Sequence, residues 1–253
     1  MMLRRWCLGL ALLALLGGAG GNGRASLREV SEALAKATPD HPADLAGRDL
    51  SDLDLSGLDF RLADLHGARL FGADLSDADF SRANLAGANL DNSVIIGTNF
   101  AGADLSHASL VAAVAYATLE IGKGKAPNFA GANLTGADML VRLGHADLHG
   151  ANLTRAQLGR EPFFNQVNDW TGCDLGDADL SQANLHGVRL AFARLDHAVL
   201  SRADLSRADL FHADLTGADL TGANLTDANL AEAELAGARG IAEDIRSRVR
   251  QTR

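Results

Sequence analysis

The chain has 253 residues, a formal net charge of −9 and an aromatic content of only 5%. Ala, Leu, Asp, Asn and Gly dominate, and there are only three lysines and one tyrosine. An ordinary globular core draws on more varied apolar side chains, so this composition favours one local environment that is repeated many times. The negative charge argues against direct nucleic-acid binding, which needs a basic surface.

Residues 1–25 have the pattern of an export signal. Arg4 and Arg5 form a charged start, and residues 6–16 form an apolar run too short to span a bilayer. Cleavage could follow Ala19 or Ala25 in the small-residue stretch beyond it. We therefore expect a periplasmic or secreted protein with no transmembrane span after cleavage. A short anchor, a buried helix and a twin-arginine export route are the alternatives.

Residues 26–38 are expected to form a short N-terminal capping helix. Ser26 and Glu29 have the spacing of a capping box, in which each side chain bonds the backbone N–H of the other. Val30 and Leu34 give the helix an apolar stripe that could close the end of a solenoid.

From residue 39 to residue 239 the sequence is organised in fives. A large apolar residue occupies every fifth position in two long blocks, and a small residue, usually Ala, lies two positions before it. A helix needs apolar residues every 3.6 positions and a half-buried strand every second position, so a period of five fits neither. It fits a coil that turns one corner per repeat, with the large and small residues inside and the intervening Asp or Asn outside.

Three phenylalanines indicate how many repeats close one coil. In the first block the large residue is Phe only at Phe60, Phe80 and Phe100, so that Phe recurs at every fourth repeat. A four-sided coil would therefore stack these rings in one core column. With about 4.8 Å between coils, some ten coils would form a rod of about 48 Å.

Residues 73–77, 83–87 and 218–222, with sequences Ala-Asp-Leu-Ser-Asp, Ala-Asn-Leu-Ala-Gly and Ala-Asp-Leu-Thr-Gly, resemble the pentapeptide-repeat family. The resemblance implies an all-β solenoid, a right-handed, parallel, four-sided β-helix with short capping helices at both ends. It says little about function, because one fold hosts many roles. Members of the family can dimerise end to end through their C-terminal coils, so a homodimer is possible.

Residues 240–253 are expected to form a basic C-terminal helix or tail. Ile241, Ile245 and Val249 have helical spacing, and arginines follow the acidic first turn, as the helix dipole favours. Two arrangements stay open: this segment covers the last coil, or the last coil pairs with another copy of the chain.

Two segments interrupt the repeat, at about 111–128 and 159–171. Irregular segments on a regular scaffold are common places for function, so both are candidate contact loops. The alternative is a tolerated insertion whose aromatic residues fold back over the core. The candidate contact residues are Tyr116, Lys123, Lys125, Phe163, Phe164 and Trp170.

No catalytic, cofactor-binding or metal-binding site is expected. Six of the eight histidines fall on different sides and coils and face solvent in the predicted coil, namely His66, His107, His149, His186, His197 and His212. Cys173 takes a small inward position ahead of Leu175, which predicts a buried packing thiol. The repeated Asp residues lie on convex faces, whereas general acid–base chemistry needs a pair in a cleft.

These observations lead to one function and one alternative. We expect a non-enzymatic, exported scaffold that binds an unidentified protein. The alternative comes from the resemblance, because some cytoplasmic family members mimic B-form DNA and bind type II topoisomerases. Residues 38–238 hold 28 acidic and 13 basic residues, or about one net charge per 3.2 Å against about one per 1.7 Å in duplex DNA. An exported protein could not reach a topoisomerase.

Overall fold

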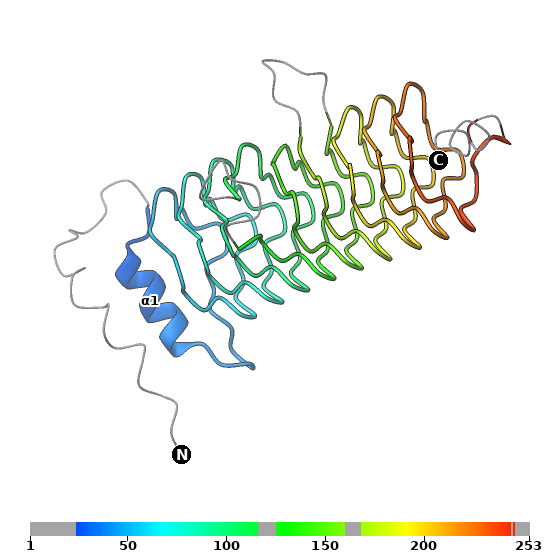
Figure 1. Cartoon of the computed structure of the whole chain (residues 1–253). Helices are drawn as coiled ribbons and strands as arrows, with labels where there is room; N and C mark the ends of the chain where they lie inside the picture. Colours follow the sequence, from blue (N-terminus) through cyan, green and yellow to red (C-terminus); the bar gives the residue numbers. More distant parts are fainter. Residues whose placement is uncertain (1–23, 116–124, 160–167, 244, 246–253) are drawn as a thin grey trace.

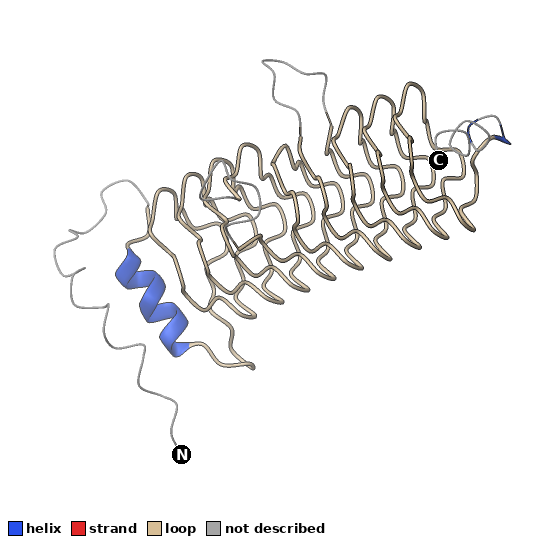
Figure 2. Cartoon of the chain, in the orientation of Figure 1, coloured by secondary structure: helices blue, strands red, loops and turns tan. Residues whose placement is uncertain are grey.

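The chain forms a right-handed β-solenoid with one helix at its N-terminal end (Figure 1). The computed structural model describes residues 24–115, 125–159, 168–243 and 245. Helix α1 spans Leu27–Lys36. Each side of a coil contributes one bridged residue, so Figure 2 draws the coil as loop. Within the described ranges, no helix has the length and apolar character needed to cross a membrane.

Four faces wind around the core, which confirms the predicted four-sided coil. The first face begins at Asp44, the second at Asp49, the third at Asp54 and the fourth at Asp59, and each of these residues forms a parallel bridge to its counterpart four repeats later. Backbone N–H groups of the large residues donate to the next coil, as Leu65 does to the Asn84 carbonyl at 2.7 Å. We name each edge after the face that precedes it.

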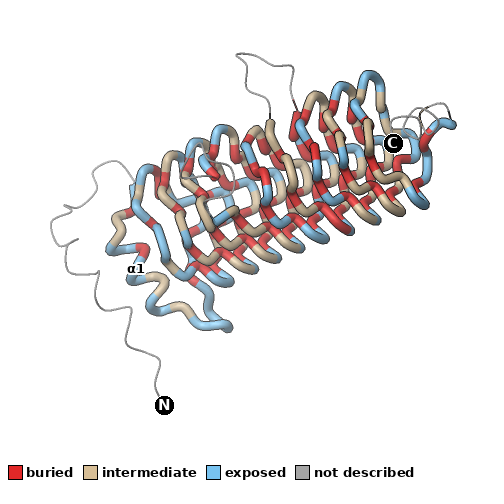
Figure 3. The backbone as a smooth tube through the Cα atoms, viewed as in Figure 1, coloured by how far each residue is buried: buried red, intermediate tan, exposed pale blue. Residues whose placement is uncertain are grey.

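The core is a continuous column of large and small apolar side chains inside the coil. Figure 3 shows buried residues recurring in every coil along the solenoid. The rings of Phe60, Phe80 and Phe100 stack along the fourth face, with centroid distances of 4.5 and 5.4 Å. Phe129 extends this stack at 5.0 Å from Phe100, although the first interruption separates the two residues in the sequence. The column therefore continues across that interruption.

The bridges show how the interruptions are accommodated. On the fourth face the step between bridged positions is 29 from Asn99 to Asn128, 19 from Asn128 to Asp147, and 27 from Asp147 to Asp174. Relative to the regular step of 20, the first is longer by nine and the third by seven, and the second is shorter by one. The fourth face holds Asp or Asn before and after each interruption. The inserted residues therefore leave the coil at its edges and do not break the face.

Both interruptions are shorter than the sequence predicted. Val114 bridges Val94, and Ala115 is buried at a position that Leu usually holds. The coil has resumed at Lys125, whose carbonyl accepts from Gly97 N–H at 2.7 Å. The expected limits of 111–128 were therefore too wide. Hydrogen bonds between coils hold the backbone at both ends of this segment, although its side chains differ from those of the regular repeat.

Helix α1 covers the N-terminal end of the core. The Ser26 hydroxyl accepts from Glu29 N–H at 3.3 Å, and the Glu29 carboxylate accepts from Ser26 N–H at 2.7 Å. Val30 is fully buried, and Leu34 packs against the core. This capping satisfies the first N–H groups of the helix and shields the apolar end of the first coil.

The C-terminal end is less completely covered within the described residues. Leu225 and Leu235 in the last coil are only partly buried, whereas their counterparts in earlier coils are fully buried. Gly240, with φ of +75°, ends the repeat, and Ile241 and Ile245 pack against the core. Most of the expected basic helix at 240–253 lies outside the described residues.

Candidate interaction surfaces

The outward Asp and Asn residues serve the backbone of the repeat. The Asp74 carboxylate accepts from Ser76 N–H at 2.9 Å, and the same turn recurs around the coil because a carboxylate or amide oxygen can reach the backbone two positions on. Asn side chains also link coils: Asn84 donates to Asp64 at 2.9 Å, and Asn99 donates to Asp79 at 3.0 Å. These columns therefore stabilise the coil.

These contacts predict that acid destabilises the protein. Hydrogen bonds from Ser51 lower the pKa of Asp49, and those from Thr221 lower the pKa of Asp219. A carboxylate whose pKa is lower in the folded state stabilises the fold above its unfolded pKa of about 3.9, and this stability is lost as the pH falls through the folded pKa. The unfolding temperature should fall below about pH 4.

Thermal unfolding followed by circular dichroism between about pH 6 and about pH 3 measures this loss. The double variant Asp49→Asn, Asp219→Asn keeps the acceptor oxygens but cannot titrate at these positions. Its unfolding temperature should fall by less over the same pH interval than that of the unmodified chain. An identical acid response in both proteins would show that these two carboxylates do not contribute.

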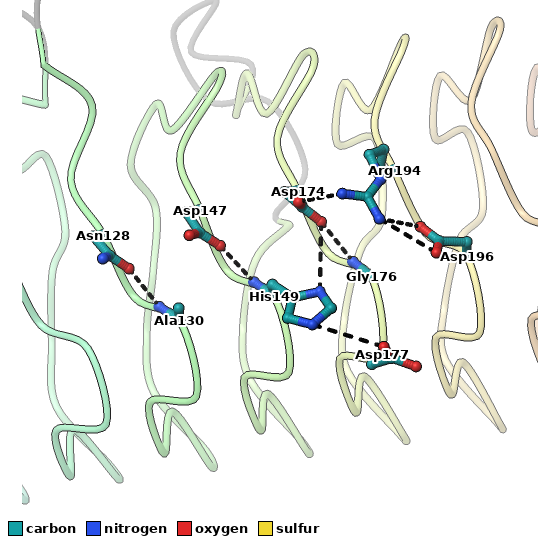
Figure 4. Close-up of polar contacts among 9 residues, drawn as sticks. All are labelled: Asn128, Ala130, Asp147, His149, Asp174, Gly176, Asp177, Arg194 and Asp196. Atoms are coloured by element: carbon teal, nitrogen blue, oxygen red, sulfur yellow. Dashed lines mark hydrogen bonds and ion pairs between the residues drawn. The ribbon is translucent and has the colours of Figure 1, made fainter.

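An ion-pair network links the fourth face with the fourth edge (Figure 4). Arg194 lies 2.6 Å from Asp174 and 3.1 Å from Asp196, and these two carboxylates, Asp174 first, raise the pKa of the guanidinium. The His149 ring lies 3.9 Å from Asp174 and 3.7 Å from Asp177. These side chains are between 24% and 59% exposed. Across the described ranges, no group of three His, Cys, Asp or Glu side chains has a metal-binding arrangement.

The predicted contact residues have different outcomes. Tyr116, Lys123, Phe163 and Phe164 lie outside the described residues. Lys125 lies on the surface, where its ammonium group is 3.0 Å from the Asp77 carboxylate and 79% of its side chain is exposed. Such an exposed pair contributes little to stability, about 0–1 kcal/mol.

Trp170 was wrongly grouped with the contact residues. Its side chain is fully buried, and its indole N–H donates to the Val141 carbonyl at 3.0 Å. It occupies the large inward position of a repeat, because its backbone N–H donates to the Arg189 carbonyl as that of Leu does elsewhere. The second interruption therefore ends before Asp169, which bridges Arg189.

The remaining candidates for chemistry are structural. Cys173 is fully buried, and burial raises the pKa of its thiol, so it does not form a reactive thiolate. The rings of His107, His145 and His197 each lie over a glycine of the following coil, where a Cβ would come within 3 Å of the ring. These histidines cover edges of the coil.

Sequence reasoning missed an exposed aromatic group on the third edge. Phe192 is 57% exposed and packs beside Phe211 and His212. The available signal was the position of Phe192, two places after Leu190, where most repeats have Gly or a polar residue.

Comparisons with known proteins agree with this architecture. The family model for pentapeptide repeats matches residues 43–77, 73–110, 171–202 and 203–239, in 8 copies. HetL, a pentapeptide-repeat protein involved in heterocyst differentiation regulation in the cyanobacterium Nostoc, shares 31% identity over 85% of this chain and 97% of its own, with a TM-score of 0.45. A pentapeptide-repeat protein from the Arabidopsis thaliana thylakoid lumen shares 31% identity over 48% of this chain and 69% of its own, with a TM-score of 0.21.

QnrB1, a plasmid-mediated fluoroquinolone resistance protein, shares 19% identity over 82% of this chain and 95% of its own, with a TM-score of 0.32. No curated protein matches the chain in a sequence search. The repeat model covers more than half of the chain, in the register of the observed coils. The chain therefore belongs to the pentapeptide-repeat family.

Proposed function

We propose that this protein is a non-enzymatic, exported scaffold whose outer surface binds another protein. The main support is the continuous four-sided coil, in which outward carboxylates and amides are engaged in turns and in contacts between coils. Pentapeptide-repeat proteins are generally structural or binding proteins. A stiff rod with regularly spaced side chains is suited to presenting a fixed surface over several coils.

The start of the fold sharpens the export proposal. Ala25 is buried, and its N–H donates to the Asp49 carbonyl at 2.8 Å. Arg24 lies 3.0 Å from the Asp52 carboxylate. Cleavage after Ala25 would remove both contacts, whereas cleavage after Ala19 would keep them. We therefore place the signal-peptide cleavage site after Ala19.

N-terminal sequencing of the protein from separated cell fractions tests this proposal. The expected result is a periplasmic or secreted chain that begins at Gly20. Export should fail when the charged start is reversed in the double variant Arg4→Glu, Arg5→Glu, and Arg24→Glu is the matched control outside the signal. A full-length chain found in the cytoplasm would overturn export.

Partner capture tests the scaffold itself. Protein crosslinked in its own cell fraction should yield a stoichiometric heteromeric complex. Sedimentation of the purified protein, measured in parallel, distinguishes such a complex from a homodimer. A chain that sediments as a monomer and yields no crosslinked partner would contradict the scaffold.

The acidic faces provide the alternative, a DNA mimic that binds a type II topoisomerase. Six of the nine outward residues on the fourth face, between Asp59 and Glu234, are acidic. Arg194 interrupts this column and pairs with Asp174, which weakens the resemblance to a phosphate backbone. A supercoiling assay decides the alternative: inhibition of gyrase at micromolar protein would favour it over the exported scaffold.

A further inference from the structure

Phe192 departs from the rule that governs the edges of the coil. In the regular repeats, the residue two places after the large inward residue adopts positive φ, and it is glycine, polar or charged except at Leu62, Ala112 and Phe192. Phe192 has φ of +60°, a conformation that bulky side chains rarely adopt. The residue is also 57% exposed, so burial does not compensate for the unfavourable backbone.

Phe192 belongs to an ordered group of rings, the aromatic edge, formed by Phe192, Phe211 and His212. The Phe192 and His212 rings are stacked, with centroids 5.2 Å apart and an interplanar angle of 14°. Phe211 packs edge-on against both, at 5.6 Å from Phe192 and 4.4 Å from His212. The group crosses two successive coils and so presents a preformed aromatic surface.

Carboxylates surround the aromatic edge. Glu232 lies 3.1 Å from His212 on the following coil. Asp209 and Asp214 are the outward residues of the adjoining third and fourth faces. Within the described ranges, the hydrogen bonds of these two aspartates use only one oxygen of each carboxylate.

Nearby arginines are engaged mainly by other acids. Arg189 and Arg194 are the bridge partners of Asp209 and Asp214, and Asp214 contributes, after Asp174 and Asp196, to raising the pKa of Arg194. Arg189 lies 3.4 Å from Asp169, and Arg194 lies 2.6 Å from Asp174. Both contacts run toward the preceding coil, away from the aromatic edge. The aromatic edge therefore combines the exposed Phe192 ring with a local excess of negative charge, a combination that attracts cations.

We propose that the aromatic edge is a docking site for a basic segment of a partner protein, in which Arg or Lys side chains flank an aromatic residue. The partner's aromatic ring packs on Phe192, and its cations lie over the ring faces and beside Asp209 and Asp214. A nucleic acid does not fit, because its phosphates would face these carboxylates. The inference rests on the proposed scaffold function and places its binding surface at one edge of the coil.

A pair of synthetic peptides tests the chemistry directly. The probe is acetyl-Gly-Arg-Trp-Arg-Gly-amide, and the control is the same peptide with Asp in place of both Arg. The protein carries ring-labelled phenylalanine and histidine and is followed by NMR. The Arg peptide should cause saturable shifts at Phe192, Phe211 and His212 at about 1 mM, weakened by salt, and the Asp peptide should cause none.

Phe192→Asn removes the exposed ring with little risk to the fold, because Asn tolerates positive φ. Leu62→Asn is the matched control, since Leu62 is also apolar, exposed and at positive φ, but lies on the fourth edge. Phe192→Asn should bind the Arg peptide about tenfold more weakly, and Leu62→Asn should bind it unchanged. Phe192→Gly also removes the ring and is a second test of whether the ring is needed for peptide binding.

Unchanged peptide binding by both Phe192 variants, or no saturable shift at the three rings, would overturn the docking site. Partner capture separates this failure from failure of the scaffold. If Phe192→Asn still yields the crosslinked complex, the scaffold stands and the aromatic edge is not its contact. If the unmodified chain yields no complex, the scaffold function fails whatever the peptides show.

Discussion

Replacing Trp170 by alanine is expected to lower the free energy of unfolding by about 4 kcal/mol. The substitution removes a fully buried indole from a narrow core, so the neighbouring coils cannot easily close the space. It also leaves the Val141 carbonyl without the indole N–H that donates to it at 3.0 Å. The unpaired buried carbonyl accounts for about 1–3 kcal/mol of this expected loss.

Urea unfolding followed by circular dichroism measures this change. Trp170→Phe keeps a ring but not the hydrogen bond, and should cost about 2 kcal/mol. Phe192→Ala is the matched aromatic control, because its ring is exposed, and should change stability by less than about 0.5 kcal/mol. Equal effects of Trp170→Ala and Phe192→Ala would contradict the burial of Trp170.

Trp170 also shows what the repeat pattern reveals and what it hides. The spacing of Phe60, Phe80 and Phe100 predicted the four-sided coil, because a core column follows from position alone. Trp170 lies one repeat before Leu175 and is therefore in the register of the second block. Trp is an unusual residue at the inward position. Trp170 was therefore not recognised as a core residue, although its spacing from Leu175 fits the repeat.

The ends of the interruptions were hidden for a similar reason. Pro127 is buried at the small inward position before Phe129, which Ala holds in most repeats. Asn168 takes the equivalent place before Trp170, and its amide donates to the Met139 carbonyl at 3.2 Å and to the Leu158 carbonyl. A proline fills the space with apolar surface and an asparagine is satisfied by hydrogen bonds. Neither could be recognised without the backbone around it.

The aromatic edge could not be predicted because it depends on contacts between coils. Phe192 and His212 are separated by four repeats, as are many other pairs at the edges. Their stacking needs both backbones at positive φ and no intervening side chain. The repeat sets which residues are neighbours, whereas side-chain packing decides whether they form a common surface.

Gly159→Ala should be the second most damaging single change, for a purely steric reason. Gly159 does not adopt positive φ, so alanine is conformationally acceptable there. A Cβ at this position would lie 2.6 Å from the backbone nitrogen and 2.9 Å from the carbonyl carbon of His186, and would also contact its carbonyl oxygen. Backbone cannot rotate away as a side chain can, so the coils must separate. The expected cost is about 3 kcal/mol.

Gly187→Ala is the matched control on the same edge of the next coil. Gly187 has φ of +65°, but a Cβ there would meet no atom within 4 Å. Only the left-handed backbone opposes alanine at this position, at a cost of about 1 kcal/mol. Urea unfolding should therefore rank Gly159→Ala well below Gly187→Ala in stability. The reverse order would mean that positive φ limits the edges more strongly than close stacking of the coils. The expected order instead makes coil-to-coil contact at Gly159 the stricter constraint at the last described residue before the second interruption, within the long step from Asp147 to Asp174.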